Sequence, residues 1–91
     1  MEIFEDDDAG YRTWLSAHRR GYVVNTSKPP GARYLILHGA SCHTITGEPS
    51  RGSTWTGGAY AKVCSETRKE LEDWAQASFA ESLTPCGSCF R

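Results

Sequence analysis

Carboxylates are nearly absent from the middle of this 91-residue chain, where Glu48 is the only acidic residue between Asp8 and Glu66. A catalytic site that depends on paired carboxylates has little material in that stretch. The sequence also lacks an HEXXH metalloprotease motif and a glycine-rich loop of the kind that cradles phosphates. These absences do not favour an enzyme, and other side chains must carry the chemistry of the protein.

Long apolar runs are missing as well. None approaches the roughly 18 residues that a membrane span needs, so we expect no membrane contact. The acidic start, with no apolar stretch behind it, is unlike a secretory signal peptide, and we expect a cytoplasmic, reducing location. There, four cysteines indicate metal binding or catalysis rather than disulfide bonds. The length allows one small domain, and 11% aromatic residues exclude a disordered tail.

The chain also lacks a strongly basic balance, since its net charge is −1. Five of its eleven acidic residues lie in the first eight positions, and all ten Lys and Arg residues follow them. Residues 9–91 carry a charge of +4, with ten basic residues against six acidic ones. The sequence therefore predicts an acidic leader, residues 1–8, before a single modestly basic domain. This balance is compatible with a nucleic-acid partner but does not require one.

Two helices are predicted, one near each end of the chain. Apolar and aromatic residues recur at helical spacing over about residues 9–20, with Asp7 or Asp8 as the N-terminal cap. Further along, Thr67-x-x-Glu70 has the pattern of a capping box and opens a second helix that ends near residue 80.

The strands are predicted between these helices. Apolar and β-branched runs bounded by turn residues predict strands at residues 22–26, 33–38 and 59–64, of which 33–38 is the strongest. Residues 46–58 are polar and rich in Gly, Ser and Thr, which predicts a long loop or a loose hairpin. The expected fold class is α+β, with an N-terminal helix, a three-stranded antiparallel sheet and a C-terminal helix.

Cysteine and histidine spacing gives the sharpest chemical signal. Two residues separate Cys86 from Cys89, so one tight turn can direct both sulfurs at a single tetrahedral ion. His38 and Cys42, with three residues between them at the end of the strongest predicted strand, supply a second pair. One His and three Cys form a common closed zinc site. We therefore predict a small zinc-stapled domain with His38, Cys42, Cys86 and Cys89 as the metal ligands.

Two changes to this ligand set remain open. Cys64 can take the place of His38, or His43 can take the place of Cys42. Cys64 falls in or at the end of a predicted strand, where a free cysteine is equally explained as a small buried hydrophobe. His18 falls on the apolar face of the first helix, where a packed histidine is commoner than a ligand.

The order of these elements resembles a widespread bacterial zinc module. A strand, His38-x3-Cys42, a second strand, a helix and Pro85-Cys86-x2-Cys89 follow one another over about residues 34–89. The arrangement is similar to the metal-binding domain of Ada-type DNA methylphosphotriester repair proteins and to modules attached to bacterial nucleases. The resemblance implies a DNA-handling role. In the Ada family a methyl-accepting cysteine stands at the position of His38, and a neutral imidazole is not that nucleophile.

The first functional expectation is a nucleic-acid-binding accessory module, most simply for DNA, that has zinc as its cofactor and can be the N-terminal module of a longer protein. An arginine would meet phosphate, hydroxyls would add hydrogen bonds and a tryptophan would stack on a base. The predicted contact residues are Arg51, Ser53, Thr54 and Trp55.

The alternative is a zinc-stabilised protein-interaction module without nucleic-acid contact, whose acidic leader docks a basic partner and whose exposed aromatic residues anchor the interface. An enzyme that uses Cys42, His43 and Cys64 as thiol and base is the least favoured expectation, because four good ligands leave no open metal position.

Overall fold

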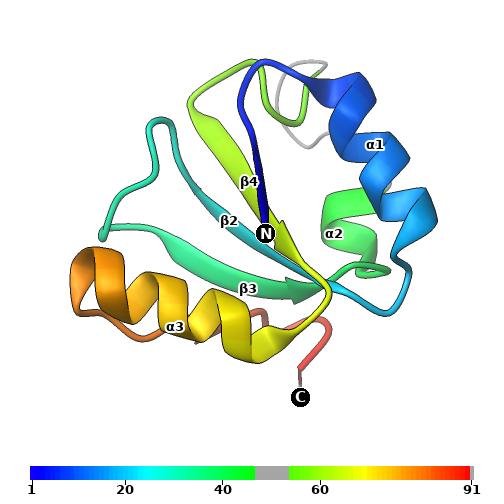
Figure 1. Cartoon of the computed structure of the whole chain (residues 1–91). Coiled ribbons are helices and arrows are strands. Elements are labelled where there is room, and N and C mark those ends of the chain that lie inside the picture. The colour runs from blue at the N-terminus through cyan, green and yellow to red at the C-terminus, as the bar shows by residue number, and fades with distance from the viewer. Residues whose placement is uncertain (47–53, 91) are drawn as a thin grey trace.

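A computed structural model describes residues 1–46 and 54–90, and it shows one curved sheet with helices on both faces (Figure 1). The sheet is five-stranded, in the order β1-β4-β2-β3-β5, and only the β3–β5 pair is parallel. Its strands are β1 (Glu2–Phe4), β2 (Tyr22–Ser27), β3 (Leu35–Gly39), β4 (Tyr60–Ser65) and β5 (Thr84–Pro85). The helices are α1 (Asp8–Ala17), α2 (His43–Thr46) and α3 (Arg68–Phe79). Within the described ranges, no helix has the length and apolarity to cross a membrane.

The three predicted strands form the antiparallel centre of the sheet, but the expected three-stranded sheet is incomplete. β1 adds one edge by pairing with β4, with Ile3 opposite Val63. β5 adds the other edge beside β3, where Pro85 needs no partner for the N–H that it lacks. Both added strands are too short to give a sequence period. The four-residue helix α2 at the start of the predicted loop is a further difference.

The predicted helices are present with shifted ends. The Asp7 side chain caps α1 by accepting a 2.9 Å hydrogen bond from the Gly10 N–H. α1 ends at Ala17, earlier than residue 20, because the His18 N–H turns back to carbonyls of the last turn. In α3, Thr67 accepts from the Glu70 N–H, which is the first half of the predicted capping box. The second half is missing because the Glu70 carboxylate instead accepts from the Ser65 hydroxyl.

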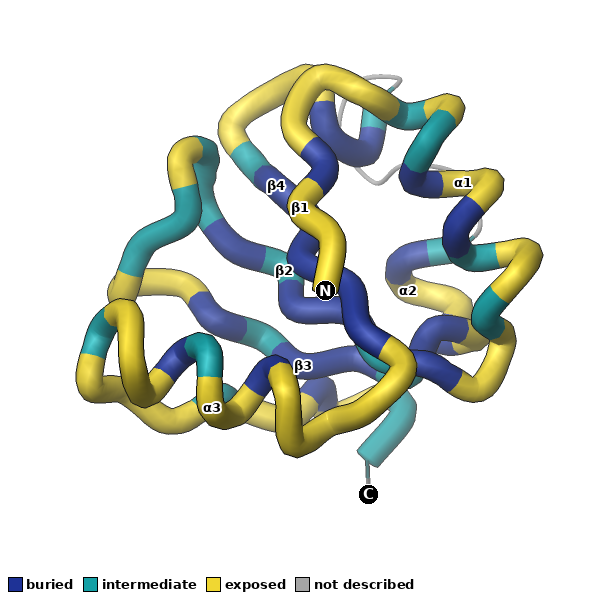
Figure 2. Tube along the Cα trace, viewed as in Figure 1, coloured by how far each residue is buried: buried dark blue, intermediate teal, exposed yellow. Residues whose placement is uncertain are grey.

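Two hydrophobic cores lie on opposite faces of the sheet, because side chains alternate along each strand. α3 covers one face, and Figure 2 shows buried positions recurring along its inner side. The residues of that core are Val24, Leu35, Leu37, Val63, Leu71 and Ala75. α1 and α2 cover the other face. The buried residues there are Phe4, Tyr11, Trp14, Val23, Ala40, Cys42, Ile45, Trp55, Cys64 and Cys86. The second core thus contains two predicted metal ligands, Cys42 and Cys86, and the alternative ligand Cys64.

The first eight residues are part of the fold rather than a leader outside it. Besides β1, Asp8 accepts four hydrogen bonds of 2.6–2.9 Å from the segment before β4. The donors are the hydroxyls of Thr54 and Thr56 and the backbone N–H groups of Trp55 and Thr56. Burial alone would raise the pKa of Asp8, but these bonds outweigh it and lower the pKa to about 2.

We predict that Asp8→Asn lowers the free energy of unfolding by about 2 kcal/mol, because an amide replaces a charged acceptor with a partial donor. The folded-state pKa lies below the ordinary value of 3.8, so this stabilisation is complete above about pH 4 and is lost as the pH falls toward 2. Urea unfolding of both proteins across this range measures the difference.

Asp73→Asn is the matched control, because Asp73 is an exposed partner of Lys69 on α3. Its effect should stay within about 0.5 kcal/mol. An equal loss in the two variants, or a difference that persists at pH 2, would contradict the role given to Asp8.

Candidate metal centre

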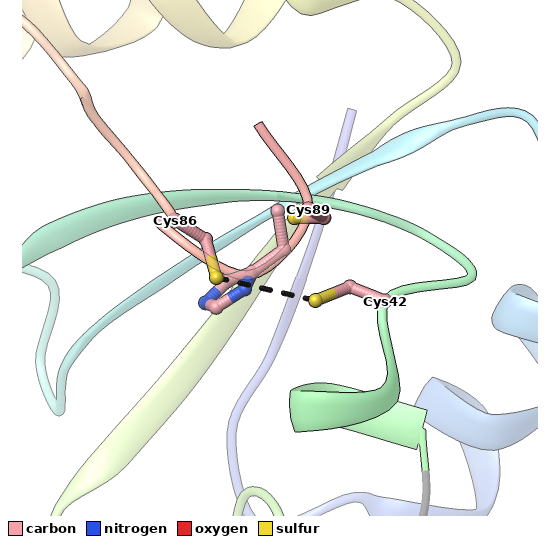
Figure 3. A group of neighbouring side chains, drawn as sticks. Cys42, Cys86 and Cys89 are labelled. Atoms are coloured by element: carbon pink, nitrogen blue, oxygen red, sulfur yellow. Dashed lines mark hydrogen bonds between the residues drawn. The ribbon is translucent and has the colours of Figure 1, made fainter. Parts of the chain in front are cut away.

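The four predicted ligands converge at one end of β3. Their ligand atoms all lie within 4.8 Å of one another, and His38, Cys42 and Cys86 are at least nine-tenths buried. Figure 3 shows the side chains of Cys42 and Cys86 pointing toward each other from the segment before α2 and from the C-terminal turn. The part of the chain that the structure describes holds this single group of metal-binding side chains.

Backbone hydrogen bonds bring the two halves of the site together. β5 places Pro85 beside Leu37, and the next N–H, that of Cys86, donates to the Leu37 carbonyl at 2.8 Å. On the other side, the Cys42 N–H closes a turn onto the Gly39 carbonyl at 3.0 Å. Cys42 and Cys86 are thus both fixed relative to β3, the strand that carries His38.

The C-terminal pair is shaped by its own tight turn. The Phe90 N–H donates to the Cys86 carbonyl at 3.0 Å, which closes a turn over the three residues between them. This is the local geometry that the two-residue spacing of Cys86 and Cys89 predicted.

The distance between the cysteine sulfurs suits a shared metal ion better than a disulfide bond. Cys42 Sγ and Cys86 Sγ are 4.0 Å apart, and all four cysteines of the chain are free. A disulfide needs about 2.05 Å between sulfurs. A tetrahedral ion with thiolates at about 2.3 Å places them about 3.8 Å apart. The donor set and its spacing therefore fit a tetrahedral metal ion.

Thr44 is a neighbour of the candidate ligands that the sequence did not reveal. Its hydroxyl lies 3.2 Å from His38 Nδ1, 3.0 Å from Cys42 Sγ and 3.9 Å from Cys86 Sγ. One hydroxyl therefore contacts three of the four ligands and helps to fix their orientation, as outer-shell partners do at metal sites. Only the helix α2 places it there, and that helix has no sequence signature.

The protonation states favour metal binding. Burial, with a contribution from the Lys62 charge, lowers the pKa of His38 to about 4, which keeps the imidazole neutral and able to ligate. Burial opposes ionisation of Cys86, but hydrogen bonds from the Ser88 and Cys89 N–H groups outweigh it and lower its pKa to about 7. In contrast, burial and the neighbouring sulfurs of Cys42 and Cys86 raise the pKa of Cys89 to about 11, which opposes its thiolate form.

The rival ligands lie elsewhere. Cys64 is fully buried in the core beneath α1, where burial raises the pKa of its thiol. His43 is exposed at the start of α2. His18 stacks on Trp14 with ring centroids 4.5 Å apart, and its Nδ1 lies 3.0 Å from the Trp14 carbonyl. The two alternative ligand sets are not assembled in the structure.

Two of the four predicted nucleic-acid contacts, Thr54 and Trp55, lie within the described residues. Arg51 and Ser53 lie outside the described residues. The Thr54 hydroxyl is used by Asp8, and Trp55 is only 7% exposed, packed at a tilt against Tyr11. Trp55 therefore packs onto the core, and the Asp8 hydrogen bonds hold its backbone beside the start of α1.

A different basic feature lies beside the metal centre. Arg12 and Ser16 of α1, Arg19 in the turn after α1, and Ser41 line a groove of about 360 Å³. No acidic residue lines this groove among the described residues. In the sequence, Arg12 and Ser16 are four residues apart within the predicted helix, whereas Arg19 lies beyond the end of α1 in the structure.

Comparison with models of protein families, with curated proteins and with solved structures finds no match for this chain.

We predict that the purified protein carries about one metal ion per chain, and that Cys86→Ser or Cys42→Ser abolishes this binding because three ligands remain. Cys64→Ala is the matched control, a cysteine of the same core outside the cluster, and it should keep the metal. Elemental analysis of the folded fractions measures the stoichiometry. Loss of metal in the Cys64 variant alone would contradict the assigned ligand set.

Proposed function

We propose that this chain is a small structural-zinc domain, similar to the Ada-like module, that binds nucleic acid through the α1 groove. The closed His/Cys3 cluster carries the first part of the proposal. Zinc takes nitrogen and sulfur ligands in tetrahedral geometry, and four protein ligands leave no position for a substrate. The ion therefore acts on stability rather than on catalysis.

The C-terminal segment supplies the reason for such an ion. After Ala80, Cys86 is the only buried residue in the described part of the chain, and the residues of β5 are exposed. A structural zinc contributes on the order of 10 kcal/mol in small domains. This is comparable to the entire stability of a typical domain, about 5–15 kcal/mol. Zinc would thus hold a segment that apolar burial cannot hold.

We predict that chelation with 1,10-phenanthroline unfolds the domain or lowers its melting temperature steeply, and that adding zinc, but not magnesium, restores it. Circular dichroism during heating measures the effect. Hydrogen exchange should show the amides of residues 84–90 losing protection first. Identical melting with and without the chelator would exclude a structural metal.

The α1 groove supports the nucleic-acid part of the proposal. Guanidinium groups bind phosphate oxygens, and serine hydroxyls add hydrogen bonds, so this lining suits a phosphate backbone. Among the ion pairs of the described residues, Asp6 pairs with Lys28 and none includes Arg12 or Arg19. Arg12 and Arg19 are consequently left to act on a ligand.

We predict that Arg12→Gln and Arg19→Gln each weaken binding to a fluorescein-labelled DNA oligonucleotide. Each should reduce the salt dependence by about one counterion, as the loss of one phosphate contact does. Fluorescence anisotropy from 50 to 200 mM salt, on single-stranded and duplex DNA, measures this. Arg51→Gln tests the contact expected from the sequence.

Arg68→Gln is the matched control, because Arg68 pairs with Glu72 on α3, on the other face of the sheet. It should leave the affinity and the salt slope unchanged. Absence of binding at 50 mM salt by the zinc-loaded protein would remove the nucleic-acid function and leave the zinc assignment intact.

A protein-interaction module is the second candidate, and the edge strand β1 favours it. Ile3 is 44% exposed there, and Tyr34 is 39% exposed near the opposite end of the sheet. An open strand edge with an exposed apolar side chain can pair with an extended segment of another protein. Capture of one protein partner that Ile3→Lys abolishes, without bound nucleic acid, would favour this function.

A further inference from the structure

A buried lysine lies on the α1 side of the sheet, on β4, which pairs with the edge strand β1. Lys62, in the middle of β4, is only 3% exposed. Its ammonium donates to Asn25 Oδ1 at 2.8 Å and to the Trp55 carbonyl at 2.9 Å. The same nitrogen lies 5.9 Å from the ring centres of Tyr11 and Trp55. Every one of these partners is neutral.

This environment leaves the lysine charge without a direct counterion. Among the ion pairs of residues 1–46 and 54–90, none includes Lys62, and two of its three N–H donors are used. Burial lowers the pKa of Lys62 to about 8, so the amine is still mainly protonated at neutral pH. A buried cation of this kind favours an anion as its next neighbour.

A cavity of about 440 Å³ adjoins this lysine. Asn25 and Lys62 lie on its sheet side, and the rings of Tyr34 and Tyr60 form an aromatic wall with centroids 5.3 Å apart. The exposed Tyr34 marks the rim, so the cavity opens to solvent. Its size falls within the range of small-molecule sites, which are commonly aromatic with a few placed polar groups.

We propose that this cavity binds a small planar aromatic molecule that bears an acidic group. The acidic group would accept the third N–H of Lys62, and the ring would pack against Tyr34 and Tyr60. A neutral ligand of the same shape would not compensate the charge of the Lys62 ammonium. The charge of the ligand, and not its shape alone, therefore defines the ligand class. The threonine that contacts the metal ligands, Thr44, also lines this cavity, whereas the α1 groove is separated from it by Trp55.

The test uses three probes on the zinc-loaded wild-type protein: 1-naphthoate, 1-naphthyl phosphate and the neutral 1-naphthamide. Titrations followed by amide NMR should show both anions shifting Asn25, Tyr60 and Lys62, with an affinity about tenfold or more above that of the amide. The better of the two anions identifies the acidic group as carboxylate or phosphate. Equal binding of the amide, or no binding of any probe, would overturn the proposal.

Variants locate the binding. Lys62→Met keeps the length of the side chain without its charge, and it should reduce anion affinity to that of the amide. Tyr34→Ala, at the exposed rim, removes an aromatic wall without touching the core, and it should weaken all three probes. Lys69→Met, exposed on α3, is the matched control and should change nothing. Unchanged binding in Tyr34→Ala would place the probe elsewhere, even where the Lys62 variant does not fold.

Discussion

The pairing of β5 with β3 is the contact on which the metal centre depends. The two residues of β5 pair with β3, and the Cys86 N–H donates one further hydrogen bond to the Leu37 carbonyl. Together these contacts place the C-terminal turn against the strand that carries His38. This contact has little apolar area of its own, because both β5 residues are exposed. The cluster and the strand pairing therefore need each other: the pairing aligns the sulfurs, and a bound ion would keep the pairing closed.

The sequence was a good guide wherever spacing is local. The two-residue gap of Cys86 and Cys89, the three-residue gap after His38 and the cap at Thr67 all depend on a few neighbouring residues, and the structure contains each of them. The short elements β1, β5 and α2 were missed for the opposite reason. Each has too few residues for a periodic pattern, so only their tertiary partners define them.

Burial of polar and aromatic side chains was the least predictable property. Nothing near Trp55 in the sequence shows that Asp8 binds its backbone from 47 residues away. Lys62 interrupts the otherwise apolar β4 and looks like an outward-facing residue, yet it points into the core side of the sheet. Such placements are decided by long-range hydrogen bonds, which composition and hydrophobic period do not encode.

The four candidate metal ligands are synthesised at different times, because they lie far apart in the sequence. Cys86 follows Cys42 by 44 residues. A ribosome that adds about 5–20 residues per second needs roughly two to nine seconds to cover that distance. Throughout this interval the nascent chain holds only His38 and Cys42 of the cluster. Binding of an ion by all four ligands can therefore occur only after Cys89 has been synthesised, and the pairing of β5 with β3 only after Pro85.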